Sequence, residues 1–420
     1  MNLFMAWRVH RGFTVKSFPG IGCILLVCCL IVITGGCDML VKPPTEPRLH
    51  ELSDREVLQY EWADDLDFTD IDQSVEQSIG YYEKVAAGTV FRYGGEVYTA
   101  QEMAASHRLF LSLVKDFAGM DLVRSLREKF IFFESANAHG GAFFTGYYEP
   151  FLQGSLEPTA EFTEPLYETP GDLIVVDLGM FSREWKQRSI VGRLDGGRLV
   201  PYDSREEIVY GNSLENRARP LAYVREIELF FLQIQGSGLI GLPDGRVTRV
   251  NYAQKNGHPY VSIGSVLRDK IPSERMSLQA IKAYLHEHPE EVRDILSLNP
   301  SYTFFREVEE GPLGNIGVVL TPNRSIAMDS ALIPGGGLAF IETELPVFED
   351  CELTGWRPVR RFVLVQDTGG AIRGHGRVDL FFGHGPKAEL TAGHMIRAGR
   401  VFLMAAKKKY IGDKEDKEDE

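Results

Sequence analysis

The 420-residue sequence is poor in cysteine, and most of that cysteine lies at one end. Four of the five cysteines, Cys23, Cys28, Cys29 and Cys37, fall within the first 37 residues, which leaves Cys351 alone in the rest of the chain. A single thiol there excludes an internal disulfide and a thiolate metal site. The fold must therefore rest on a hydrophobic core, for which 44% hydrophobic residues in a chain of this length are ample.

Positive charge is also scarce. The chain carries 45 Lys and Arg residues against 59 Asp and Glu residues, which gives a formal net charge of −14 at pH 7. An acidic surface repels polyanions, so nucleic acid is excluded as a partner and anionic lipid is a poor one. No internal repeat is visible, and length alone suggests about two or three domains.

The longest uncharged apolar run, residues 21–33, is too short to span a bilayer comfortably. Basic residues precede it, and Gly35-Gly36-Cys37 follows it. This is the layout of a secretory signal covering residues 1–36. A cysteine directly after small residues resembles the lipobox of bacterial lipoproteins, so Cys37 is expected to become the lipidated N-terminus. An ordinary cleaved signal and an uncleaved anchor are the alternatives.

The segments next to the expected lipid and at the C-terminus look unstructured. Residues 37–55 contain three prolines without clear apolar periodicity, which is typical of a tether. Residues 411–420 form a charged tail that we expect to be disordered. Together with the signal, this predicts an exported lipoprotein that is membrane-anchored and faces the periplasm, in either the inner or the outer membrane.

Hydrophobic periodicity predicts a mainly β fold with N-terminal helices, an α+β arrangement. Helices are expected from Asp72 to about Val85, after the capping box Thr99–Glu102, and from Leu122 to Phe132. A further helical segment, Ser277 to Leu296, is interrupted by Pro289. The predicted strands include Leu173–Leu178, Phe230–Ile240, Ile316–Leu320, Asp329–Ile333, Leu338–Glu342, Phe362–Val365, Val378–Phe382 and Arg400–Ala406.

Two aspartates stand out in the glycine-rich stretch from Val365 to Gly385. Asp367 follows one predicted strand, and Asp379 lies within the next. Two carboxyls could therefore face one turn-rich rim and perform acid–base chemistry. The alternative is that both aspartates only cap turns, where Asp is common, and the stretch alone does not decide between the two.

Other chemistries find less support. His375, His384 and His394 lack the helical spacing that brings two imidazoles onto one face, so a metal site is disfavoured. The triple glycine at 335–337 has no following Lys-Ser/Thr, which disfavours a nucleotide site. Ser237 is not in a Gly-x-Ser-x-Gly elbow, which disfavours a hydrolase triad.

Several motifs occur in one order along the chain: FFTGYYEP (143–150), FFLQIQGSG (230–238), NGHPYVSIG (256–264), NPSYTFF (299–305), SIAMDSALIPGG (325–336) and QDTGGAIRGHGRVDLFFGHG (366–385). Together they resemble the membrane-bound lytic murein transglycosylase A family. The resemblance implies a double-psi β-barrel domain built from residues 56–148 and 306–410. It also implies an inserted β-rich domain, residues 149–305, and a substrate groove between the two. The family's three aspartates match Asp329, Asp367 and Asp379.

The same resemblance implies an activity. Lytic transglycosylases cleave the β-1,4 bond between N-acetylmuramic acid and N-acetylglucosamine in peptidoglycan without water, and they form a 1,6-anhydro ring. Asp379 would act first as acid and then as base, with Asp367 in support. The implied substrate-binding residues are Thr145, Tyr147, Gln235, Gly236, Ser237 and Asp329. No metal or other cofactor is implied, and the expected partners are glycan strands, the lipid anchor and other cell-wall enzymes.

Two other functions remain open at the level of sequence. A hydrolysing endoglucanase can use the same barrel but needs a second carboxylate acting on water. A non-catalytic glycan-binding or scaffold lipoprotein would bind murein sacculi and release no soluble fragments. Product analysis distinguishes the three, because only the transglycosylase leaves anhydro ends.

Overall fold

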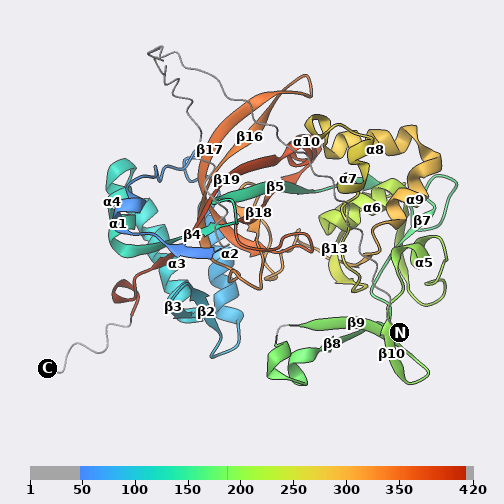
Figure 1. Ribbon diagram of the computed structural model, residues 1–420, viewed down its shortest axis with the longest axis horizontal. Coiled ribbons are helices and arrows are strands. Elements are labelled where there is room, and N and C mark those ends of the chain that lie inside the picture. The colour runs from blue at the N-terminus through green and yellow to red at the C-terminus, as the bar shows by residue number, and fades with distance from the viewer. Residues whose placement is uncertain (1–47, 187, 413–420) are drawn as a thin grey trace, which may run out of the picture. The chain divides into compact units, whose positions relative to one another are not determined.

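The computed structural model describes residues 48–186 and 188–412 (Figure 1). The predicted signal peptide, most of the predicted tether and residues 413–420 of the predicted tail lie outside the described residues. Within the described ranges, no helix is both long and apolar enough to cross a membrane.

Six strands close into a barrel (Figure 1). In ladder order they are β5 (Ala142–Glu149), β18 (Arg377–His384), β15 (Ser325–Ala327), β17 (Glu352–Asp367), β16 (Leu338–Glu349) and β19 (Ile396–Ala406). Closure comes from β19, which pairs with β16 along one part of its length and with β5 along another. Beyond β19 the sheet continues through β4 (Phe130–Ala136) to β1 (Arg48–Glu51).

The core inside the barrel receives side chains from every barrel strand. Phe144, Ile326, Ile341, Val363, Leu380 and Leu403, one from each strand, are buried in a single cluster. Successive side chains of a strand point to opposite faces, so their neighbours lie on the outside of the wall. On one outer side, aromatic residues of β16, β17 and β19 pack against the N-terminal helices in a second cluster.

The elements of the N-terminal part pack against both clusters. They are α1 (Asp54–Val57), α2 (Ile71–Lys84), the hairpin of β2 (Val90–Tyr93) and β3 (Glu96–Thr99), α3 (Ala100–Asp116) and α4 (Gly119–Lys129). The predicted capping box at Thr99 is confirmed, because its side chain accepts from the Glu102 N–H while Glu102 accepts from the Thr99 N–H.

A buried ion pair ties the N-terminal segment to the barrel. The Arg324 guanidinium donates to both carboxylate oxygens of Asp64, at 2.6 and 2.9 Å, and both side chains are fully buried. Asp64 also accepts from the backbone N–H groups of Leu66, Phe68 and Phe362. These donors favour the ionised carboxyl and hold the pKa of Asp64 below its usual value despite burial.

Residues 151–307 form three smaller sheets within the described part of the chain. They are a four-stranded sheet of β6 (Phe151–Gln153), β12 (Ser237–Gly241), β13 (Val247–Lys255) and β14 (Thr303–Glu307), a pair of β7 (Glu164–Tyr167) and β11 (Pro220–Val224), and a three-stranded sheet of β8 (Ile174–Asp177), β9 (Ser189–Asp195) and β10 (Arg198–Pro201). The domain division predicted at residues 149 and 305 stays a prediction.

Helices accompany these sheets and the barrel. They are α5 (Arg205–Val209), α6 (Glu226–Gln235), α7 (Ile263–Val266), α8 (Leu278–Glu287), α9 (Val292–Ser297) and, between β18 and β19, α10 (Pro386–His394). The predicted helical segment with a break at Pro289 is thus confirmed as α8 and α9, with a 3-10 turn at Pro289–Glu291 between them.

The strand predicted from Phe230 to Ile240 is wrong. This stretch is helix α6 up to Gln235, and strand β12 begins only at Ser237. Gly236 ends the helix with φ +81°, a conformation that glycine adopts without strain. The helix is buried on almost every side. Its apolar residues therefore occur on all faces, and the sequence shows no clear helical period. Gln233 and Gln235 therefore do not share a strand face.

Two other predicted strands, Ile316–Leu320 and Asp329–Ile333, are also wrong, because both segments are mainly turns. The Asp329 carbonyl accepts from the Leu332 and Ile333 N–H groups, which bends the chain. The predicted helix ending at Phe132 stops at Lys129, since Phe130 already begins β4. The predicted strands around Asp367 and Asp379 are confirmed within β17 and β18, and so is the mainly β fold class with N-terminal helices.

Candidate active site

Strand pairing brings Asp367 and Asp379 together. Asp367 is the last residue of β17, and Asp379 lies in β18. The short strand β15 runs between them, and its residue Ala327 pairs with Asp367 on one side and with Asp379 on the other. The two carboxyls therefore lie on either side of one residue of the barrel wall.

The side chain of Asp379 points away from the barrel interior. Val378 and Leu380, its neighbours in β18, belong to the interior cluster, so the alternation of the strand places Asp379 on the outer face. Ala327, Phe381 and Tyr147 form a small buried cluster at this side of the wall. The candidate site is thus on the outer surface of the wall made by β5, β18 and β15, and Asp379 is half-buried there.

A single hydroxyl hydrogen bond holds the Asp379 carboxyl. Thr145 pairs with Asp379 across the parallel strands β5 and β18, and its hydroxyl donates to Asp379 Oδ1 at 2.5 Å. The Arg377 guanidinium donates in turn to Thr145 Oγ1 at 2.8 Å. Burial raises the pKa of Asp379, while the charge of Arg377 and the Thr145 hydrogen bond oppose that shift.

Asp367 is held by three donors. The Tyr147 hydroxyl donates to Asp367 Oδ2 at 2.9 Å, and the N–H groups of Asn315 and Thr368 each donate to Oδ1 at 2.9 Å. Burial raises the pKa of Asp367 to about 6, and the nearby Asp379 charge adds to the rise. Thr145 and Tyr147 are two residues apart on β5, so they present their hydroxyls to the two aspartates from one strand face.

The two carboxyls interact, so ionisation of one makes it harder for the other to lose its proton. Three donors stabilise ionised Asp367, whereas Asp379 has one. Hydrogen bonds to a carboxylate favour its charged form, but the Arg377 charge also favours ionised Asp379, and the Asp379 charge adds to the raised pKa of Asp367. The hydrogen bonds distinguish the two carboxyls in another way: Asp379 Oδ2 accepts none from the described residues, whereas both oxygens of Asp367 accept from the protein.

Asp329 fastens the loop between β17 and β18. Its Oδ2 accepts from the Gly374 N–H at 2.8 Å, and its Oδ1 accepts from the Ala331 N–H and from Arg373. The loop also needs glycine at Gly376, where φ is +63° and an added Cβ would lie 2.4 Å from the Gly141 carbonyl oxygen. Both carboxylate oxygens of Asp329 thus accept hydrogen bonds from the protein. Its role in glycan binding stays a prediction.

The other predicted binding residues lie beside β5. Gln235 Oε1 accepts from the Tyr148 N–H at 3.0 Å, which fixes the end of α6 next to Tyr147. The Gly236 carbonyl accepts from the Tyr252 N–H at 2.7 Å, and Ser237 is buried at the start of β12. The Gln235 amide nitrogen forms no hydrogen bond among the described residues. Glycan contacts by Gln235, Gly236 and Ser237 stay predictions.

The sequence reasoning assigned no role to Arg377 or Tyr260. Arg377 lies two residues before Asp379 in the same strand. Because side chains alternate along a strand, the sequence alone could have predicted that both lie on one face. Tyr260 lies in the NGHPY turn, which Asn256 and Asn299 fix through hydrogen bonds to surrounding backbone. Burial raises the pKa of Tyr260; the Ser262 hydrogen bond and the Arg205 charge oppose that rise, and the Asp379 charge adds to it.

The three histidines do not converge. His375 Nδ1 lies 3.5 Å from Ser135 Oγ, and His394 Nδ1 contacts the Leu390 carbonyl of its own helix. The grouping of possible metal ligands found in the described ranges is instead His288, Glu290 and Glu291. Glu291 already accepts from Lys270 and Tyr284, so this surface group needs no ion.

Comparison with known proteins gives this site a family. Family profiles described as "MltA specific insert domain" and "3D domain" match residues 143–306 and 324–405. Membrane-bound lytic murein transglycosylase A of Escherichia coli (strain K12) is 34% identical over 277 residues, which cover 64% of this chain and 67% of that protein. The chain belongs to the membrane-bound lytic murein transglycosylase A family. The predicted resemblance is therefore confirmed.

Solved structures of lytic murein transglycosylase A family members agree with the fold. The crystal structure of a membrane-bound lytic murein transglycosylase from Agrobacterium tumefaciens has a TM-score of 0.69 and 26% identity, and the match covers 86% of this chain and 99% of that chain. The crystal structure of E. coli MltA with bound chitohexaose has a TM-score of 0.65 and 25% identity, with 87% and 97% covered. The predicted fold class, a double-psi barrel with an inserted β-rich part, is confirmed.

Proposed function

We propose that this chain cleaves peptidoglycan glycan strands by intramolecular transglycosylation, with Asp379 as the one group that transfers protons. Family membership carries the activity: the chain is a peptidoglycan lytic transglycosylase. One observation supports the choice of Asp379. Burial raises the pKa of both carboxyls, but Asp379 Oδ2 accepts no hydrogen bond from the described residues and is left for the substrate, whereas both oxygens of Asp367 accept from the protein.

In the first step, protonated Asp379 donates its proton to the glycosidic oxygen between N-acetylmuramic acid and N-acetylglucosamine. The bond between the anomeric carbon and that oxygen breaks, and the N-acetylglucosamine side leaves as an alcohol. Positive charge develops on the muramic ring as an oxocarbenium-like state forms. We assign the stabilisation of this charge to Asp367 in its ionised form, which the Tyr147 hydrogen bond holds in place.

In the second step, Asp379 is a carboxylate and accepts the proton of the C6 hydroxyl of the same muramic residue. The C6 oxygen bonds to the anomeric carbon and closes a 1,6-anhydro ring. Asp379 has given one proton to the leaving oxygen and gained another from the C6 hydroxyl, so the enzyme is regenerated and no water is consumed. Thr145 and Arg377 stabilise the carboxylate between the two steps, because both favour its charged form.

A groove along the outer wall would hold the glycan. E. coli MltA was crystallised with bound chitohexaose, a chain of six sugars, which supports an extended glycan site in this family. We assign Thr145, Tyr147, Gln235, Gly236 and Ser237 to this site, because the structure places the last three beside the strand that carries the first two. Asp329 supports the site by holding the loop before β18.

The proposed location is a membrane surface facing the periplasm. The curated relative is named membrane-bound, and in this chain the candidate anchor is Cys37 after a signal peptide of residues 1–36. These residues lie outside the described ranges. Labelling with a radioactive fatty acid in a bacterial host would test the anchor, since Cys37→Ala should abolish incorporation.

The products provide a direct test of the reaction. Digestion of purified sacculi is expected to release muropeptides that lack a reducing end and are lighter by one water than the products of hydrolysis. Mass analysis before and after borohydride reduction measures both properties. New reducing ends would contradict transglycosylation and favour an endoglucanase-like hydrolase, and binding without release would favour a scaffold protein.

Thr145→Val is expected to move the pH dependence of cleavage upward and to lower the maximal rate by roughly tenfold. The Thr145 hydroxyl favours the charged form of Asp379, so its loss raises the Asp379 pKa further. Because the first step needs protonated Asp379, the rate falls as pH rises through that pKa, and this fall should then occur at higher pH. Rates on sacculi measured across pH check the shift. Thr145→Ser keeps the hydroxyl and should retain the wild-type profile.

A further inference from the structure

The three-stranded sheet of β8, β9 and β10, drawn in green in Figure 1, has one apolar face. We call residues 172–201, which include this sheet and the turns around Phe181 and Trp185, the arm. Residues paired across antiparallel strands share a face. The pairs Val176 with Ile190, Leu194 with Leu199, and both Ile174 and Pro201 with Gly192 place only apolar side chains and a glycine on one face.

This apolar face is exposed. Leu194 is 63% exposed and Ile190 is 46% exposed, although a side chain in such a sheet would normally cover a core. The turn between β8 and β9 adds larger groups, since Met180 is 84% exposed, Phe181 72% and Trp185 44%. Contiguous exposed apolar groups of this kind mark a binding surface.

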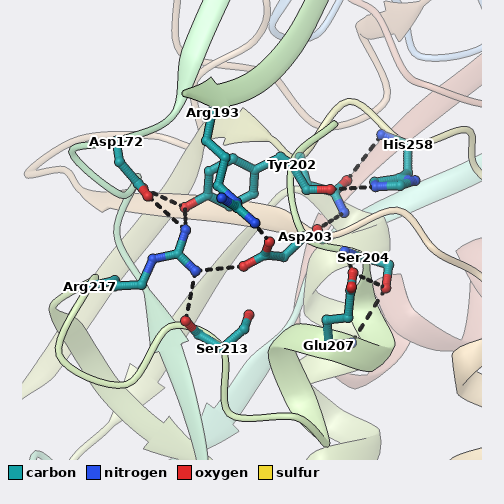
Figure 2. Close-up of polar contacts among 10 residues, drawn as sticks. Asp172, Arg193, Tyr202, Asp203, Ser204, Glu207, Ser213, Arg217 and His258 are labelled. Atoms are coloured by element: carbon teal, nitrogen blue, oxygen red, sulfur yellow. Dashed lines mark hydrogen bonds and ion pairs between the residues drawn. The ribbon is translucent and has the colours of Figure 1, made fainter. Parts of the chain in front are cut away.

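The opposite face of the arm is fixed to the rest of the protein. Arg193 and Val191 lie on that face, where Arg193 donates to Asp203 and Val191 packs so closely on Gly257 that an added Cβ would be 2.6 Å away. In Figure 2 the Arg217 guanidinium donates to the carboxylates of Asp203 and Asp172, at 2.6 and 2.7 Å. These contacts hold the base of the arm in place. The apolar face therefore points away from the network that holds the arm.

The turn between β8 and β9 is basic, unlike the protein as a whole. Arg183, Lys186 and Arg188 are exposed in it beside one acidic residue, Glu184, whereas the complete arm has five basic and four acidic residues. The whole chain carries −14. The net negative charge of the whole chain disfavours binding to anionic lipid, but it therefore does not apply to this local surface.

We propose that the arm docks on an anionic phospholipid surface. Trp and Phe side chains enter the boundary between headgroups and acyl chains, and neighbouring Lys and Arg side chains bind lipid phosphates. This chemistry matches the tip around Phe181 and Trp185 and its basic neighbours. A second copy of this chain fits less well, because it would bring two basic turns together.

The length of the N-terminal tether is consistent with contact between the arm and the membrane. Arg48, the first described residue, is eleven positions after Cys37, and a chain of that length spans at most about 40 Å. If Cys37 is lipidated, the folded part must stay near the bilayer, and the arm would then set its orientation. The docking proposal itself does not depend on the catalytic role of Asp379.

The test uses the lipid-free chain from Asp38 onward, which contains every described element. Flotation with phosphatidylglycerol–phosphatidylethanolamine vesicles is expected to carry this chain upward, with binding weakened by salt. The double variant Phe181→Ser, Trp185→Ser should lower partition at least tenfold, because burial of one such side chain is worth about that factor. Murein cleavage in solution should not change, which separates this test from that of the proposed function.

Met120→Ser is the matched control, because Met120 is 74% exposed on α4 and outside the arm. It should leave vesicle binding unchanged. Absence of binding to anionic vesicles at low salt would overturn the proposal, as would equal loss in the control or normal binding by the double variant. Self-association that the double variant abolishes, without vesicle binding, would instead identify the apolar face as a contact between copies.

Discussion

Asp379→Asn is expected to stop the release of soluble fragments from murein while the protein remains folded. An amide cannot donate the first proton or accept the second, and loss of one general acid or base step alone costs about 10²–10⁴-fold. The change keeps the size of the side chain. Asp379 accepts one hydrogen bond from the protein, from the Thr145 hydroxyl, and the amide oxygen of Asn can still accept it. The rate of turbidity loss of sacculi and the thermal midpoint of the variant measure the two effects.

Two further variants sharpen this prediction. Asp350→Asn, at the exposed tip of the β16–β17 hairpin, is a matched control that should keep full activity. Asp367→Asn should retain some cleavage, because in the proposed mechanism Asp367 stabilises charge without transferring the proton. If Asp379→Asn degrades murein at the wild-type rate, the proton donor is another group, and the assignment fails.

Asp64→Ala is expected to lower the free energy of unfolding by about 3–5 kcal/mol. The change leaves the fully buried Arg324 without its carboxylate partner and removes the acceptor of three backbone N–H groups. An unpaired buried charge is far more costly than the absence of both charges. Urea unfolding followed by circular dichroism measures the change through the transition midpoint.

Two variants control this experiment. Glu76→Ala removes a carboxylate from the exposed face of α2 and should change stability by no more than about 0.5 kcal/mol. Adding Arg324→Met to Asp64→Ala should restore part of the loss, since no charge then remains buried. A stability of Asp64→Ala equal to that of Glu76→Ala would show that the ion pair does not hold the N-terminal segment.

Local sequence patterns predicted the strands that carry the two aspartates, because each is a short apolar run bounded by glycine. They could not predict the partners. Thr145 and Asp379 are 234 positions apart, and only the register of β5 against β18 brings them into contact. The family motifs pointed to both residues, but the hydrogen bond and the Arg377 contact required the structure.

The errors have physical causes of the same kind. The FFLQIQ run is apolar on every side because helix α6 packs against neighbours on several faces, so its helical period was hidden. Asp329 entered the predicted site through the family motif, and its role in glycan binding stays a prediction. In the structure its carboxylate holds backbone N–H groups of two turns, a task that depends on where those turns fold.

Closure of the barrel also determines when the enzyme can first act. Strand β5 lies before residue 150, but its partners β18 and β19 come from the last fifty residues of the described chain. Thr145 can therefore meet Asp379 only after residues 377–406, which form β18 and β19, have been synthesised. The order of synthesis thus delays assembly of the candidate site until these late strands are available.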